Sequence, residues 1–119
     1  MKVLNIKGFN EEICDIDCNK LVFKPRKPVV IDFYSESCLP CRQMMPILEE
    51  LSIKYSDVYD FYKINIDDGY EIADFFNMVG LPTIMLIKGQ KKIQLAGVRT
   101  KEKLENFMLK FFNGNGNDE

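Results

Sequence analysis

Hydrophobic side chains follow two different periods along this chain, and the change of period separates strands from helices. The apolar run Val29–Tyr34 is interrupted only by Asp32, as expected for a strand covered on both faces of a sheet. A helical period follows, with one face made of Met44, Ile47, Leu48, Leu51 and Tyr55. Between the two periods stands the sequence Cys38-Leu39-Pro40-Cys41.

The same patterns predict a strand and helix order for the rest of the chain. We expect strands at 3–6, 29–34, 58–66, 83–87 and 92–98, and helices at 11–18, from Cys38 to about Tyr55, 70–77 and from 101 onward. Asn10 and Thr100 are the expected caps of the first and last helices. The order β-α-β-α-β-α-β-β-α predicts an α/β fold with a central mixed β-sheet flanked by helices.

Core positions and boundaries follow from these elements. A turn at residues 88–90 joins the last two strands into a hairpin, and Leu21–Pro28, with two prolines and three basic residues, is a connection. Residues 1–112 are expected to form one domain, and the Gly-, Asn- and acid-rich stretch 113–119 a disordered tail. Further core contacts are expected from Phe9, Ile13, Ile16, Tyr59, Phe61, Ile64, Ile66, Ile72, Ala73, Phe75, Phe76, Leu104, Phe107, Met108 and Phe111.

Composition narrows the class of protein. A chain of 119 residues with 46% hydrophobic residues can bury a core without obligatory disulfides or metal. Its net charge of -2 gives no reason to expect a nucleic acid or a membrane as partner. The first twelve residues lack an apolar signal segment, so we expect a cytoplasmic protein.

The cysteines carry the candidate chemistry. Cys38 falls at or just before a helix N-terminus, where free amide N–H groups and the positive dipole end favour a thiolate. Pro40 is tolerated there because the first turn has no N–H partner to lose. Four cysteines in a reducing compartment indicate catalysis or metal binding before structural disulfides. The chain has no His, which excludes Cys–His catalysis and weakens a zinc interpretation.

Several features in a fixed order make the chain resemble thioredoxin over roughly residues 1–112. In chain order they are Asp32 six positions before Cys38, the C-x-x-C pair, Pro46 five residues past Cys41, Lys63 in the following strand, the loop Gly80-Leu81-Pro82-Thr83 and Gly97 near the end of the last strand. The resemblance implies the thioredoxin fold and a thiol-disulfide oxidoreductase that reduces protein disulfides.

The resemblance assigns roles to the two central cysteines. Cys38 is then the nucleophile that forms a mixed disulfide with the substrate, and Cys41 resolves it. The enzyme would cycle between the dithiol and a Cys38–Cys41 disulfide, with no cofactor and no metal.

Other residues would support this cycle. Burial should raise the pKa of Asp32, which suits it to take and return the Cys41 proton, and Lys63 would moderate that shift. Pro82 would follow a cis peptide bond and face the disulfide, leaving the Leu81 backbone free to pair with substrate. A docking rim would comprise Ser37, Leu39, Pro40, Leu81 and Gly97.

The sequence also departs from the family. Leu39-Pro40 replaces the usual Gly-Pro, and Ser37 and Tyr34 stand where Trp is common. Such changes near the cysteines tune the reduction potential. Electrons would come from a flavin-dependent thioredoxin reductase linked to NADPH or ferredoxin, and the protein would be a monomer.

Three alternatives remain open at this point. The cysteine pair could serve a disulfide oxidase or isomerase of higher potential, or the chain could be a non-catalytic interaction module. A metal site could be imagined from Cys14, Cys18, Cys38 and Cys41. On the predicted first helix Cys14 and Cys18 share a face, where they would act as core filler or as a second redox pair.

Overall fold

The computed structural model of the chain describes residues 1–114 and contains the elements in the expected order. They are β1 (Lys2–Val3), α1 (Ile6–Glu12), β2 (Val29–Tyr34), α2 (Leu39–Lys54), β3 (Asp60–Asn65), a 3-10 turn (Ile66–Asp68), α3 (Tyr70–Phe75), β4 (Thr83–Lys88), β5 (Lys91–Ala96) and α4 (Lys101–Asn113). The predicted α/β class with a mixed sheet is therefore confirmed.

The strands form one sheet in the order β1-β3-β2-β4-β5. β1 and β2 run parallel to β3, whereas β4 runs antiparallel to β2 and β5 antiparallel to β4. Because β2 and β4 are antiparallel, the end of β2 lies beside the start of β4, with Phe33 opposite Thr83. The segments that leave β2 and enter β4 therefore meet at one end of the sheet.

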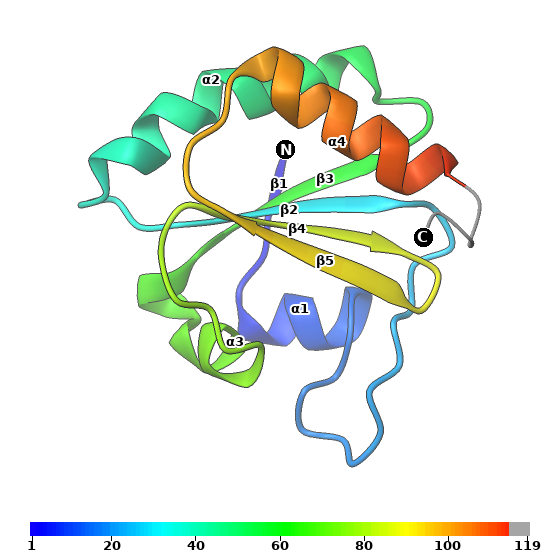
Figure 1. The fold of residues 1–119 in the computed structure, drawn as a ribbon. Helices are drawn as coiled ribbons and strands as arrows, with labels where there is room; N and C mark the ends of the chain where they lie inside the picture. Colours follow the sequence, from blue (N-terminus) through cyan, green and yellow to red (C-terminus); the bar gives the residue numbers. More distant parts are fainter. Residues whose placement is uncertain (115–119) are drawn as a thin grey trace.

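Each face of the sheet has its own hydrophobic core, and Figure 1 shows α2 and α4 on one face with α1 and α3 on the other. Alternation along β2 sends Val29, Ile31 and Phe33 into the core beneath α1 and α3. Val30 points into the core under α2 and α4, and Asp32 shares its face because side chains alternate. A carboxylate thus lies in the interior beneath α2.

The central strand and helix lie where the sequence places them. β2 has the predicted bounds, and Cys38 is the N-cap of α2. Met44, Leu48 and Leu51 are fully buried under the helix.

The first helix was placed wrongly by the sequence pattern, which put a strand at 3–6 and a helix at 11–18. Asn5, not Asn10, caps α1, because its side chain accepts the Gly8 N–H at 2.8 Å. The Asn10 side chain instead accepts the Ile16 N–H at 3.1 Å and so closes the turn after the helix. Phe9 and Ile13 are nonetheless fully buried, as expected.

Smaller differences concern element ends. β3 is shorter than 58–66, and α3 ends at Phe75 because Asn77 adopts φ 56°, a left-handed conformation that stops a helix. Phe75 and Phe107, expected in the core, are exposed, and Phe112 is buried in the α4 stripe. Asn113, expected in the tail, is the last residue of α4, and residues 115–119 of the predicted tail lie outside the described residues.

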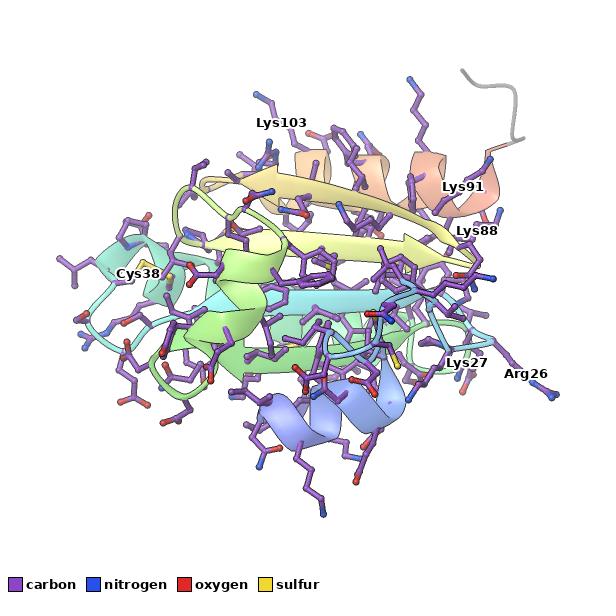
Figure 2. The ribbon with its side chains drawn as sticks, turned by 90° about the horizontal axis from the view of Figure 1, so that it is seen from below. Arg26, Lys27, Cys38, Lys88, Lys91 and Lys103 are labelled. Carbon is purple, nitrogen blue, oxygen red and sulfur yellow. A yellow bond between two sulfur atoms is a disulfide. The ribbon has the colours of Figure 1, made fainter. Side chains whose placement is uncertain are left out.

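The connection Leu21–Pro28 is confirmed as irregular and is fixed to the hairpin turn. The Gln90 side chain accepts the Phe23 N–H at 2.8 Å and donates to the Phe23 carbonyl at 2.7 Å. The connection and the hairpin turn therefore share one end of the molecule. Figure 2 shows this end, marked by Arg26 and Lys88, opposite Cys38.

Cys14 and Cys18 do not share a helix face, because both follow the end of α1. Cys14 is fully buried in the core beneath α1 and α3, whereas Cys18 is exposed. We predict that Cys14→Ala lowers the free energy of unfolding by about 1–2 kcal/mol through lost packing, and that Cys18→Ala changes it by less than about 0.5 kcal/mol. Urea denaturation measures both values, and equal losses would contradict the placement.

Candidate functional site

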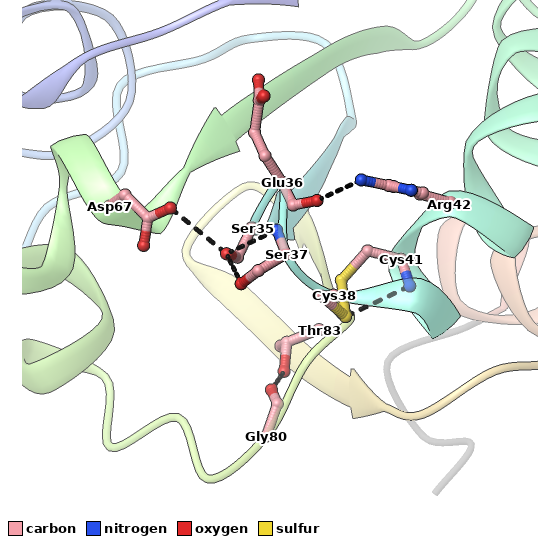
Figure 3. Close-up of a disulfide and its surroundings, with 9 residues drawn as sticks. All are labelled: Ser35, Glu36, Ser37, Cys38, Cys41, Arg42, Asp67, Gly80 and Thr83. Carbon is pink, nitrogen blue, oxygen red and sulfur yellow. Dashed lines mark hydrogen bonds between the residues drawn. A yellow bond between two sulfur atoms is a disulfide. The ribbon is translucent and has the colours of Figure 1, made fainter.

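The disulfide between Cys38 and Cys41 opens α2 (Figure 3). Cys38 precedes the helix as its N-cap, and its sulfur accepts the Cys41 N–H at 3.2 Å. This bond satisfies one of the free amides of the first turn and would favour a thiolate after reduction. Cys38 is partly exposed, whereas Cys41 is only 2% exposed. The two sulfurs therefore differ in their access to a partner.

A hydrogen-bond network holds the loop before Cys38. The buried Ser35 hydroxyl lies 3.1 Å from the Ser37 hydroxyl and donates to the Asp67 carboxylate at 3.2 Å. The Cys38 N–H donates to the Ser35 carbonyl at 3.2 Å. On the other side, the Arg42 guanidinium donates to the Glu36 carbonyl at 2.9 Å. The loop is thus fixed to α2 and to the turn that follows β3.

The sequence interpretation missed Ser35, Asp67 and Arg42 as site residues. The predicted strands at 29–34 and 58–66 end directly before Ser35 and Asp67, and neither residue was given a role. The two are 32 positions apart, and only the pairing of β2 with β3 brings them together. The sequence could have indicated this contact, because both residues follow the carboxyl ends of strands that are adjacent and parallel.

Asp32 is fully buried, and neither of its carboxylate oxygens has a hydrogen-bond partner among the described residues. Burial raises the pKa of Asp32 to about 7, against the charge of Lys63, which lowers it. Lys63 is the direct neighbour of Asp32 in the pairing of β2 with β3. Asp32 can therefore change protonation near neutral pH.

The loop before β4 closes the site from the other side. The Leu81–Pro82 peptide bond is cis, as the resemblance implies. The Thr83 hydroxyl donates to the Gly80 carbonyl at 2.6 Å, and the Gly97 N–H donates to the Pro82 carbonyl at 2.9 Å. Gly97 has φ 93°, which a residue with a Cβ rarely adopts. Pro82 and Gly97 are therefore brought together beside the end of β2.

The residues expected in the docking rim come from three segments. Ser37, Leu39 and Pro40 are exposed at the start of α2, and Leu39 is 67% exposed. Leu81 and Gly97 are partly buried. The start of α2 thus presents an exposed apolar side chain beside the disulfide, whereas the Gly97 backbone is already bonded to Pro82 and Arg99.

A pocket of about 420 Å³ opens beside Cys41. It gives water a place next to the buried residue Cys41. Burial, aided by the charges of Glu36 and Asp32, raises the pKa of the Tyr34 phenol, so this side chain stays neutral at the pocket wall. The lining residues are Tyr34, Ser35, Glu36, Cys41, Arg42, Met45, Pro46 and Glu49.

Residues 1–114 contain neither a cluster of metal ligands nor a helix that could cross a membrane. No group of three or more His, Cys, Asp or Glu side chains in this range is placed to hold a metal ion. Within the same range, no helix has the length and apolar character needed to cross a membrane.

Comparison with known proteins gives consistent similarities. Residues 6–110 match the family model described as Thioredoxin. The chain is 40% identical to a thioredoxin of Alicyclobacillus acidocaldarius over 80 residues, which covers 66% of this chain and 76% of the relative. It is 37% identical to a thioredoxin of Borreliella burgdorferi over 92 residues (76% and 78%) and 34% identical to one of Rickettsia bellii over 110 residues (92% and 92%).

The Ser35–Asp67 bond gives a test of how the loop is held. We predict that Asp67→Ala lowers the free energy of unfolding by about 1 kcal/mol, because the buried Ser35 hydroxyl loses its acceptor. The neighbouring exposed carboxylate of Asp68 is the matched control, and Asp68→Ala should stay within about 0.5 kcal/mol of the parent. Urea denaturation compares the two, and equal losses would exclude a specific role for the bond.

Asp32 should make stability depend on pH. Because its folded pKa of about 7 lies above the ordinary value of 3.8, the folded protein binds more protons than the unfolded chain between these values. Stability should therefore fall as pH rises from about 4 to about 7 and level off above that.

We predict that Asp32→Asn is more stable than the parent at about pH 8, by at most on the order of 4 kcal/mol, and gains little or nothing at about pH 4. Urea denaturation of the oxidised proteins at both pH values measures the difference. An Asp32→Asn advantage that is the same at both values would show that Asp32 does not titrate in this range.

Proposed function

Because this chain belongs to the thioredoxin family and is a protein-disulfide reductase, we propose that Cys38 attacks the substrate and Cys41 completes the reaction. The observation that carries this assignment is the difference in exposure between the two bonded cysteines. An outside disulfide can approach Cys38, whereas Cys41 is reached from within the protein.

The reaction proceeds in two exchanges. The Cys38 thiolate attacks one sulfur of a substrate disulfide, that bond breaks, and the other substrate sulfur leaves as a thiolate that takes up a proton. Cys41 then loses its proton and attacks the Cys38 sulfur of the mixed disulfide. The Cys38–Cys41 bond forms, and the second substrate sulfur leaves as a thiol. The substrate gains two electrons, and the protein becomes oxidised.

Asp32 accepts the proton of Cys41 in the second exchange. Its position beneath α2 and its pKa of about 7 support this role, since a base with a pKa near the working pH transfers protons efficiently. The pocket beside Cys41 offers room for a water molecule at the cysteine end of this transfer. Lys63 keeps the pKa of Asp32 from rising further.

Substrate docks on the rim around the disulfide. Its extended backbone pairs with Leu81 before the cis-Pro82, and its side chains contact Ser37, Leu39, Pro40 and Gly97. The exposure of Leu39 and the bond between Gly97 and Pro82 support a single continuous surface.

Membership of the family supports the remaining assignments that we propose. The reductant is a flavin-dependent thioredoxin reductase linked to NADPH or ferredoxin, the partners are disulfide-bearing proteins, and the protein acts as a cytoplasmic monomer. The redox group is the Cys38–Cys41 disulfide itself, with no additional cofactor. An oxidase, an isomerase and a non-catalytic module are not favoured by the family membership and the disulfide.

Substitution of Cys38 and substitution of Cys41 should block different exchanges of the reaction. We predict that Cys38→Ser abolishes disulfide reduction, whereas Cys41→Ser accumulates mixed disulfides with the substrate, because only the second exchange is blocked. Insulin reduction with dithiothreitol measures the activity, and mass spectrometry without reductant detects the mixed disulfide.

Alkylation of the reduced parent at neutral pH gives an independent control. Iodoacetamide should modify Cys38 well before Cys41. Equal rates at the two thiols would contradict the assignment of nucleophile and resolving cysteine.

A further inference from the structure

The flank of α4 that faces away from α2 carries a groove unrelated to the cysteines. Lys101 and Glu105 turn toward α2, where they pair with Glu50 at 3.0 Å and Lys54 at 2.5 Å. The opposite flank has a groove of about 520 Å³, and Figure 2 shows Lys103 projecting from the helix into solvent. The residues that line this α4 groove are Arg99, Lys103, Asn106, Phe107 and Lys110.

The residues that line the α4 groove include three cations and no carboxylate. Within residues 1–114, the ion pairs use other cations, namely Lys2, Lys7, Lys27, Lys54 and Lys101. Arg99 donates to the carbonyls of Ala96 at 2.8 Å and Gly97 at 3.3 Å, and neither partner is an anion that would offset the guanidinium charge. No carboxylate lines the groove, and Phe107 is 39% exposed within it. The lining fits a ligand with several carboxylates and an apolar contact.

The open edge of the sheet indicates the kind of ligand. Helix α4 packs on β4, and β5 is the outermost strand of the sheet on that side. An outer strand has backbone N–H and C=O groups with which an extended polypeptide can pair. Lys91, at the start of β5, adds a cation at this edge. Lipid headgroups and nucleic acids cannot make such strand pairing.

Arg99 links the α4 groove to the proposed docking rim. Arg99 follows Gly97 by two positions and bonds to the Gly97 carbonyl. The Gly97 N–H in turn bonds to the carbonyl of cis-Pro82. A polypeptide docked at the disulfide can therefore extend along β5 and reach the cations of α4.

We propose that the α4 groove binds an acidic, extended segment of the proteins whose disulfides this reductase reduces. The inference rests on the proposed docking rim. It deepens the proposed function by naming the substrate class: protein disulfides adjoined by a segment rich in Asp and Glu. Carboxylates of that segment pair with Arg99, Lys103 and Lys110, while its apolar side chains contact Phe107.

Binding can be tested without any redox chemistry. The probe is a fluorescent, cysteine-free octapeptide of alternating Glu and Val, titrated by anisotropy at low ionic strength. Lys103→Glu/Lys110→Glu should weaken its binding more than tenfold, and Lys103→Gln/Lys110→Gln at least threefold, in line with exposed ion pairs. The matched control is Lys7→Glu/Lys20→Glu, which changes the net charge equally elsewhere and should weaken binding less than twofold.

Turnover then separates this inference from the proposed function. With a disulfide peptide that carries the Glu-Val segment, kcat/KM should fall at least threefold in Lys103→Gln/Lys110→Gln. With hydroxyethyl disulfide, which is small and neutral, the rate should stay unchanged. Normal turnover of both compounds by the variant overturns the α4 groove as a substrate site. A parent protein that fails to reduce either compound overturns the proposed function instead.

The parent and the Lys103→Glu/Lys110→Glu variant also distinguish a polypeptide ligand from other anionic partners. Phosphatidylserine vesicles or a single-stranded oligonucleotide that bind more tightly than the Glu-Val peptide, with the same loss in Lys103→Glu/Lys110→Glu, would overturn the assignment to a polypeptide. A Lys-Val octapeptide that binds as well as the Glu-Val peptide would overturn the role of charge.

Discussion

The burial of strand β2 between β3 and β4 is the constraint on which the rest of the structure depends. Val29, Val30, Ile31 and Phe33 are at most 1% exposed, because they lie in the middle of the sheet with helices on both faces. The same burial fixes the point at which the chain leaves the sheet. Cys38 then caps α2 at that end, beside the start of β4. A redox pair at the end of a rigid strand keeps its geometry while substrates exchange.

The same strand holds a group that opposes folding. A buried carboxylate without hydrogen-bond partners costs free energy whenever it is charged. Two effects limit this cost. The raised pKa lets the Asp32 carboxyl group take up a proton near neutral pH, and the positive charge of Lys63 on the adjacent strand stabilises the carboxylate when it forms. Neither effect neutralises the carboxyl group completely. The result is a group that binds and releases a proton near neutral pH. Stability is lowered at the position where the proposed mechanism needs a base.

Charge acts locally in this protein. The net charge of -2 is the difference between sixteen basic and eighteen acidic residues, and it does not show where these residues lie. On the α2 side of α4, lysines and glutamates pair across the two helices. On the other side, three cations and Phe107 line the α4 groove without a carboxylate. Helix α4 therefore packs on the core and also presents a cationic surface next to the open edge of the sheet.

The sequence by itself determined those features that depend on near neighbours. Residues of β2, the cap at Cys38 and the face of α2 lie within one short stretch, so their periodicity and the capping rules suffice. The tertiary structure decided what depends on distant partners. Asn5 and Asn10 are both good caps, and the pattern could not show that the second would close a turn instead. The bond from Ser35 to Asp67 and the link from Gly97 to Pro82 join segments that only packing brings together.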